Sequence, residues 1–143
     1  MHHEIVCSWL GKMEFEGDVM GHKIRLDDKS SFGSKDSGPS PKRLLLLALA
    51  GCTGMDIVPM LEKMRVPISG LRITVDAEGT DVDPRVYTRV RILYEFSGID
   101  LEASRTKIAR AVSLSQEKYC GVSAMLHKAM DIQYEILFVP TLP

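Results

Sequence analysis

The sequence has few cysteines and no excess of charge, and both features narrow the class of protein. Its 143 residues include 3 cysteines, an odd and sparse set unlike the even, dense framework of a small secreted protein. The formal net charge of -1 gives no bulk attraction to nucleic acid or to anionic lipid. We therefore expect neither a nucleic acid nor a membrane as a partner, and a reducing, cytoplasmic location.

Long apolar runs and targeting signals are also missing. The longest apolar run, residues 44–50, is too short to span a bilayer, and the Met-His-His-Glu start lacks the basic and apolar regions of a signal peptide. With 45% hydrophobic and 26% charged residues, the composition is that of an ordinary globular protein. The length fits a single domain, residues 1–143, with a substantial core.

Motifs for the common cofactors are absent as well. Neither G-x-G-x-x-G nor G-x4-G-K-[ST] occurs, and there is no G-x-S-x-G elbow, so nucleotide chemistry and serine hydrolysis have no support. The histidines show no ligand spacing on a predicted helix, and no C-x2-C accompanies them. We therefore expect no metal and no cofactor. The histidines are His2, His3, His22 and His127.

Hydrophobic periodicity and chain-breaking residues predict an α+β fold with short strands at the N-terminus. The predicted strands are residues 3–10, 13–17, 22–26, 71–78, 86–96 and 132–138. The predicted helices are residues 41–65, a helix capped by Asp100 that ends near Gln116, and a shorter one after Gly121. Residues 29–40 are rich in Ser, Gly, Asp and Pro, which predicts a loop.

The helix predicted from Pro41 has an unusual distribution of apolar residues. After two cations its first half is apolar on every side, which indicates burial on all faces by its own chain or by a partner subunit. Gly51 and Gly54 flank Cys52, and glycines are unfavourable inside a helix unless something packs closely against the backbone. We therefore expect this helix to be central to the fold.

Two of the cysteines are candidates for chemistry. Cys52 follows Lys42 and Arg43 on its own helix, and Cys120 lies near a predicted helix N-terminus. Cations and helix N-termini both favour a thiolate, which is the nucleophilic form. The alternative is that each is a small, inert core residue, because free cysteines are often fully buried. Cys7, on a predicted strand, is best interpreted as a core residue.

Two stretches resemble the cysteine motifs of the OsmC/Ohr family, the osmotically induced and organic-hydroperoxide-resistance proteins. These are GPSPKRLLLLALAGCTGMD (38–56) and AVSLSQEKYCGVSAML (111–126), and the resemblance extends over residues 4–138. It is closest to the OsmC-like branch with an S-P-x-E-L-type helix start and an S-x-E-K-Y-C second motif. The resemblance implies an OsmC-like intertwined homodimer of α+β subunits, with antiparallel sheets around long buried central helices and two equivalent sites at the interface.

The resemblance also implies thiol-dependent peroxidase chemistry. The residue matching Cys52 attacks a hydroperoxide and becomes a sulfenic acid, which the residue matching Cys120 resolves to an intramolecular disulfide. A dithiol reductant then restores both thiols, and no metal, haem or flavin is needed. An apolar pocket would favour organic hydroperoxides as substrates.

The sequence departs from the family where the thiolate is held. Family members use a Glu early in the central helix and an Arg from another segment, but Lys42 occupies the Glu position and Arg43 follows it. Arg25 is a candidate for the activating Arg. Lys42 or Arg43 would stabilise the Cys52 thiolate directly if its side chain pointed inward. The substitution leaves a second hypothesis open, a non-enzymatic small-molecule binding protein of the same fold with weak or absent peroxidase activity.

Overall fold

The computed structural model describes all residues, 1–143, and the chain divides into two compact units, Met1–Leu45 and Leu46–Pro143. Each unit contains one three-stranded sheet, and the helices pack on the second sheet. The expected α+β class is therefore confirmed. That residues 1–143 act as a single domain stays a prediction.

The N-terminal unit contains a small antiparallel sheet, as predicted. The strands β1 (Val6–Gly11), β2 (Glu14–Val19) and β3 (His22–Leu26) pair in the order β1-β2-β3. Gly21 turns the chain between β2 and β3 with a φ of 86°, a left-handed conformation that glycine adopts without steric cost. The following loop has no regular secondary structure through residue 40.

Asp27 organises the loop that follows β3. Its buried carboxylate accepts hydrogen bonds from the backbone N–H groups of Asp28, Lys35 and Ser37, and from the Ser37 hydroxyl. These donors, the Ser37 N–H first among them, lower the pKa of Asp27 to about 2. The ionised side chain of Asp27 thus ties the loop to the end of β3.

The second unit contains a mixed sheet. The strands β4 (Gly70–Gly79) and β5 (Tyr87–Ser97) form the predicted antiparallel hairpin, and β6 (Asp131–Phe138) pairs with β5. The β5–β6 pairing is parallel, because the helical segment between the two strands returns the chain to the same end of the sheet. The expected antiparallel arrangement therefore holds for the first sheet and for the hairpin, whereas β6 departs from it.

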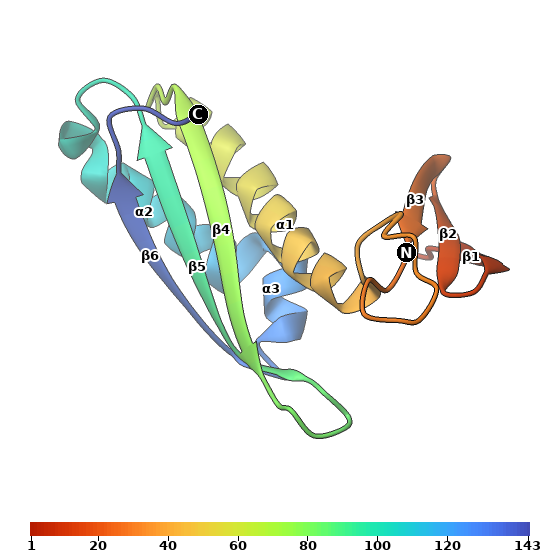
Figure 1. Ribbon diagram of the computed structural model, residues 1–143. Coiled ribbons are helices and arrows are strands. Elements are labelled where there is room, and N and C mark those ends of the chain that lie inside the picture. Colours follow the sequence, from red (N-terminus) through yellow and green to blue (C-terminus); the bar gives the residue numbers. More distant parts are fainter. The chain divides into compact units, whose positions relative to one another are not determined.

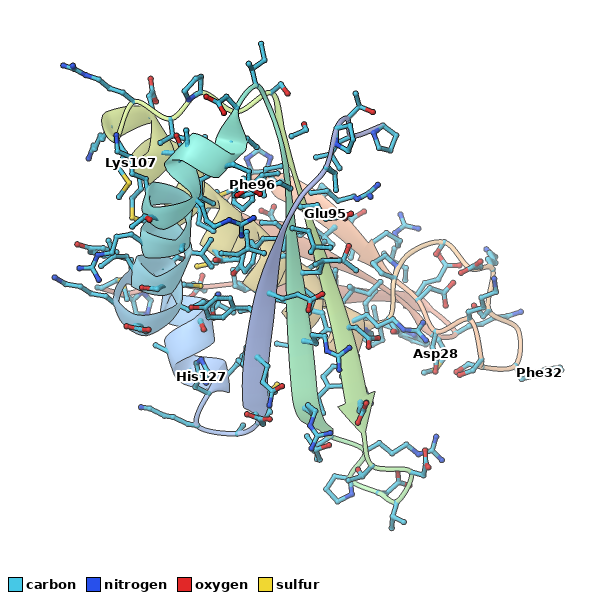
Figure 2. The ribbon with its side chains drawn as sticks, turned by 90° about the vertical axis from the view of Figure 1, so that its left-hand side faces the viewer. Asp28, Phe32, Glu95, Phe96, Lys107 and His127 are labelled. Atoms are coloured by element: carbon cyan, nitrogen blue, oxygen red, sulfur yellow. The ribbon has the colours of Figure 1, made fainter.

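Helices cover one face of this sheet (Figure 1). They are α1 (Pro41–Lys63), α2 (Arg105–Leu114) and α3 (Gly121–Leu126). Alternation along β5 separates its two faces: Phe96 points toward the helices and is fully buried, whereas Glu95 lies on the opposite face and pairs with Arg72 at 2.7 Å (Figure 2). The core of the unit therefore lies between the sheet and the helices.

Within this single chain, α1 buries one stripe rather than its whole circumference. The buried residues recur every four positions, which places them along one face of the helix: Leu49, Thr53, Ile57 and Leu61. On other faces Leu47, Met55 and Val58 are exposed. Burial of α1 on all faces by its own chain is thus excluded, and a partner subunit stays a prediction.

By length and composition alone, the 23 residues of α1 could also cross a membrane, although the uninterrupted apolar run of residues 44–50 is too short to do so. The core helix of a soluble protein has the same composition, and the buried stripe of α1 packs against the rest of this unit.

Asp100 does not cap a helix, contrary to the prediction. Its backbone adopts a left-handed conformation (φ 54°) and its side chain makes no capping hydrogen bond. A 3-10 turn, η1 (Leu101–Ser104), comes first, then α2, and a π-helical turn, η2 (Ser115–Tyr119), leads to Cys120. The segment expected as one continuous helix is therefore three consecutive pieces, and the last of them positions a cysteine.

Candidate functional site

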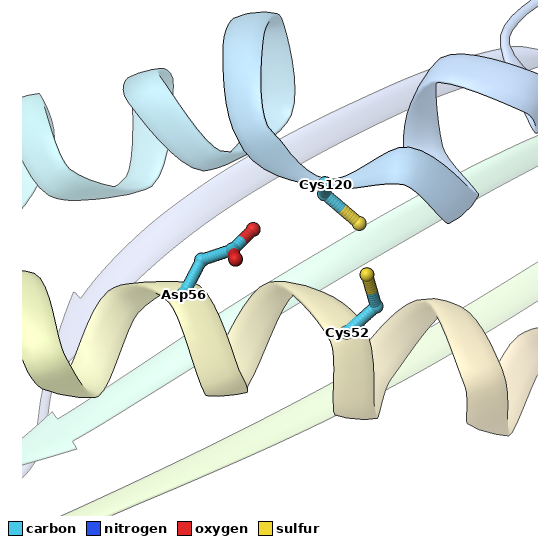
Figure 3. Close-up of side chains that lie close together, drawn as sticks. All are labelled: Cys52, Asp56 and Cys120. Carbon is cyan, nitrogen blue, oxygen red and sulfur yellow. The ribbon is translucent and has the colours of Figure 1, made fainter. Parts of the chain in front are cut away.

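Cys52 and Cys120 lie side by side although 67 residues separate them in the sequence. Cys52 lies midway along α1, and Cys120 is the residue immediately before α3. Their sulfur atoms and a carboxylate oxygen of Asp56 all lie within 4.8 Å of one another (Figure 3). Both cysteines are free thiols, so the site is in its reduced form.

The two thiols have different environments. Cys52 is half-buried, whereas Cys120 is only 2% exposed. Burial, followed by a hydrogen bond to Cys52, raises the pKa of Cys120 to about 11, although the Ser123 N–H donates to its sulfur at 3.3 Å and opposes the rise. The N-terminus of α3 lies next to Cys120, as predicted, but its lowering of the pKa of Cys120 is smaller than the rise caused by burial. At neutral pH this thiol is protonated.

Asp56 was not among the residues singled out from the sequence. It lies four positions after Cys52, which places the two side chains on the same face of α1. Its carboxylate accepts a hydrogen bond of 3.0 Å from the Ser115 hydroxyl, and its charge adds to the rise in the pKa of Cys120. The spacing of four is visible in the sequence, whereas the family resemblance points to the position of Lys42 at the start of α1.

A buried hydrogen-bond network lies behind the thiols. Thr53 Oγ1 is 2.8 Å from both the Tyr94 hydroxyl and the Ser115 hydroxyl. The Gln116 amide donates to the Tyr94 oxygen at 2.7 Å and to Thr53 Oγ1 at 3.2 Å, and accepts from the Ser123 hydroxyl at 2.7 Å. Burial raises the pKa of Tyr94 to about 12, so its hydroxyl stays neutral.

The direction of these hydrogen bonds follows from the number of protons. Each hydroxyl has one proton, and Ser115 gives its own to the Asp56 carboxylate. Ser115 must therefore accept from Thr53, and Thr53 must accept from Tyr94. A directed chain thus runs from Tyr94 through Thr53 and Ser115 to Asp56, and it joins β5 and α1 to the segment that leads to Cys120.

The three cations expected to stabilise the Cys52 thiolate lie near the start of the chain and at the start of α1. Arg25 forms ion pairs with Glu14 at 3.0 Å and with Glu16 at 3.4 Å, all within the N-terminal unit. Lys42 and Arg43 are exposed in the first turn of α1. The effect of these three side chains on Cys52 stays a prediction.

An apolar cavity of about 570 Å³ opens beside Asp56, along the second half of α1. Three methionines and Tyr119 are among its lining residues, and Lys63 is the cation. The complete lining is Met55, Asp56, Pro59, Met60, Lys63, Met64, Leu114 and Tyr119. Methionine side chains adapt to ligands of different shape, so this cavity suits an apolar molecule.

The two sheets, the central helix and the paired cysteines define a class of two-cysteine α+β protein, and comparison with known proteins identifies the family. The model of the OsmC-like protein family matches residues 33–135. The chain therefore belongs to the OsmC-like family, as the cysteine motifs indicated.

Individual relatives agree with this assignment. The chain is 35% identical over 132 residues to protein YhfA of Escherichia coli K12, covering 90% of this chain and 94% of that protein. A crystal structure of a hypothetical protein from Aquifex aeolicus superposes with a TM-score of 0.80 at 25% identity, covering 97% of this chain and 98% of the other.

An organic hydroperoxide resistance protein, OhrB of Bacillus subtilis, shares the fold. Its TM-score is 0.65 at 12% identity, with 95% of this chain and 98% of that chain covered.

Proposed function

We propose that this protein is a thiol-dependent peroxidase that reduces organic or small hydroperoxides, with Cys52 as the peroxidatic and Cys120 as the resolving thiol. The observation that carries the proposal is the sulfur pair within 4.8 Å, of which Cys52 is the more accessible member. A peroxide approaching from solvent meets Cys52 first. The buried Cys120 is close enough to complete a disulfide after modest side-chain rotation.

The cycle balances with a dithiol as the only reductant. The Cys52 thiolate attacks the distal oxygen of ROOH, the O–O bond breaks, and one proton completes ROH while Cys52 becomes a sulfenic acid. Cys120 then attacks the Cys52 sulfur, the S–O bond breaks, and the hydroxyl leaves as water with the Cys120 proton. A dithiol reduces the disulfide through a mixed disulfide and is itself oxidised.

We propose a homodimer in a reducing, cytoplasmic setting as the working form. The support is an apolar cavity of about 640 Å³ along α1 and β4, which includes Gly51, Gly54 and the exposed Met55 and Val58. A side chain at Gly54 would approach Ile73 to 3.0 Å, whereas one at Gly51 would meet nothing. The glycine at 51 is thus unexplained within one chain, and close approach of a second subunit would explain it.

The thiolate of Cys52 needs a positive partner, and we assign this role to one of Lys42, Arg43 and Arg25. Asp56 has the wrong charge for it, so we propose that the carboxylate instead orients the site through its bond to Ser115. Substituting each cation by alanine and measuring the alkylation rate of Cys52 would identify the activating residue.

The test of the proposed function is a thiol map before and after peroxide. Reduced protein is treated with one equivalent of cumene hydroperoxide or hydrogen peroxide, alkylated, digested and analysed by mass spectrometry. We expect a peptide linked through Cys52 and Cys120 within seconds, and no such peptide in the Cys52→Ser variant. Unchanged thiols at high peroxide excess would exclude the peroxidase.

The second candidate is a non-enzymatic binding protein of the same fold. The apolar, methionine-lined cavity beside Asp56 favours it, together with Lys42 at the family's Glu position. A binder would take up an apolar ligand stoichiometrically while its thiols stay reduced in the presence of peroxide. The thiol map therefore separates the two functions.

A further inference from the structure

We propose that Cys52, Asp56 and Cys120 of the reduced protein together bind one thiophilic divalent metal ion, with Zn²⁺ as the reference case. The metal site requires only the reduced side chains. Its consequence for the reaction with peroxide rests on the proposed function.

The donor set matches the chemistry of zinc. Two cysteine sulfurs and one carboxylate oxygen are ordinary zinc ligands, and a water would complete a four-coordinate site. In a tetrahedral zinc centre the ligand atoms lie ~3.7 Å from one another, given zinc–ligand bonds of ~2.0–2.3 Å. The three atoms here lie within 4.8 Å without a metal, so closure requires side-chain movements of ~1 Å. Figure 3 shows all three side chains entering the same space from α1 and from the segment before α3.

The charges of the cluster also favour a cation. Each of its three groups carries a negative charge when deprotonated, and the polar partner of Asp56 is the neutral Ser115 hydroxyl rather than a cationic side chain. A divalent ion would neutralise the carboxylate and both thiolates at once. Metal capture therefore displaces the thiol protons and compensates the negative charges that their loss creates.

The surroundings hold the donors in place. The chain of hydroxyl groups from Tyr94 ends on Asp56, and the Cys120 backbone N–H donates to the Ser115 carbonyl at 2.8 Å. Such outer contacts orient metal ligands and preserve affinity. The half-buried Cys52 and Asp56, with the cavity beside Asp56, give an ion access from solvent.

Metal binding and disulfide formation exclude one another, because both use the same sulfur electron pairs. Zn²⁺ displaces two thiol protons when it binds. Oxidation of the loaded site consumes ROOH and two protons and yields the disulfide, ROH, water and free Zn²⁺. Bound zinc therefore slows the attack on peroxide, and peroxide in excess releases the metal.

The experiment measures zinc binding to the full-length, reduced chain in competition with a chromophoric chelator. The background carries His2→Ala, His3→Ala and Cys7→Ser, which remove ligands outside the cluster. The interpretation of Cys7 as a core residue is wrong, because its thiol is exposed on β1. Asp56→Asn is compared with Glu62→Gln, a matched change of an exposed carboxylate on the same helix. We expect one Zn²⁺ per chain, weakened at least about 10-fold by Asp56→Asn and unchanged by Glu62→Gln.

Co²⁺ provides a readout that needs no substitution in the cluster. Bound at this site it should show the strong d–d bands of a tetrahedral centre and thiolate-to-cobalt charge transfer, and both should vanish after oxidation to the disulfide. No zinc binding against the chelator, or equal affinity in the Asp56→Asn and Glu62→Gln variants, would overturn the proposal. The thiol map is made on metal-free protein, so failure of the peroxidase and failure of the metal site are seen separately.

Discussion

Removal of the Thr53 hydroxyl from the buried hydrogen-bond network should destabilise the protein by an amount that the structure allows us to estimate. Thr53→Val keeps the shape of the side chain and removes a group that is 0% exposed and bonded to Tyr94, Ser115 and Gln116. Ser115 still donates to Asp56, and Gln116 still donates to Tyr94. The Tyr94 hydroxyl proton, however, loses its acceptor inside the core.

The expected loss of folding stability follows from the Tyr94 hydroxyl, a buried donor that is left without an acceptor. A buried polar group without a partner costs ~1–3 kcal/mol, so we expect Thr53→Val to destabilise the second unit by about 2 kcal/mol. Thr74→Val, on the exposed face of β4, is the matched control and should change stability by no more than about 0.5 kcal/mol. Urea unfolding followed by circular dichroism measures both, and hydrogen exchange of α1 and β5 peptides localises the loss.

A double-mutant cycle tests the hydrogen bond between Tyr94 and Thr53 directly. The cycle is measured in a Gln116→Met background, because the Gln116 amide donates to both oxygens and would lose both acceptors in the double variant. In that background Tyr94→Phe removes the donor that Thr53→Val leaves unsatisfied, so the double variant should be about 1 kcal/mol more stable than the sum of the single effects predicts. Strict additivity would show that the two hydroxyls are not bonded to each other. In the peroxide assay Thr53→Val should slow disulfide closure more than sulfenic acid formation, because the network holds the segment before Cys120.

Three further outcomes test the site and the loop. In the proposed cycle Cys120→Ser should leave Cys52 as a sulfenic acid that a dimedone adduct reveals, and an unmodified Cys52 would contradict its peroxidatic role. Asp56→Asn should lower the pKa of Cys120 by about half a unit, as measured by alkylation rate against pH, because a charge under 5 Å away is removed. The pKa of Asp27 is lowered from 3.8 to about 2, so its stabilisation of the loop is complete above pH 4 and is lost as the pH falls through 2. Hydrogen exchange of the loop amides should therefore lose its protection over this pH range, and Asp27→Asn should abolish that pH-dependent loss.

Local patterns predicted most of the fold and only part of the site. Alternation located β4 and β5, and Ser40-Pro41 located the start of α1, because these signals are carried by neighbouring residues. Asp100 failed as a cap because its left-handed backbone directs the chain into a 3-10 turn, a tertiary outcome that residue type does not determine. The parallel pairing of β6 depends likewise on the path between strands.

The two cysteine motifs predict Cys52 and Cys120 as site residues, but they do not predict Asp56 or Ser115. Its two sulfurs come from segments far apart in the sequence, so their proximity was known only through the family resemblance. Asp56 could have been found from its helical spacing to Cys52, whereas its partner Ser115 lies in a π-helical turn that no local pattern indicates. π-helical turns are frequent at functional sites, and here the turn supplies both the Asp56 donor and the carbonyl that holds Cys120.

The high pKa of Cys120 accounts for the order of steps in the proposed cycle. Burial comes first among its causes, but the hydrogen bond and the charge of Cys52 also contribute. When Cys52 becomes a neutral sulfenic acid, the charge contribution disappears while burial remains, so the thiol at Cys120 becomes easier to ionise only after peroxide has reacted. In the proposed cycle Cys120 therefore reacts slowly with peroxide while the site is reduced, and its reactivity rises when a sulfenic acid lies beside it.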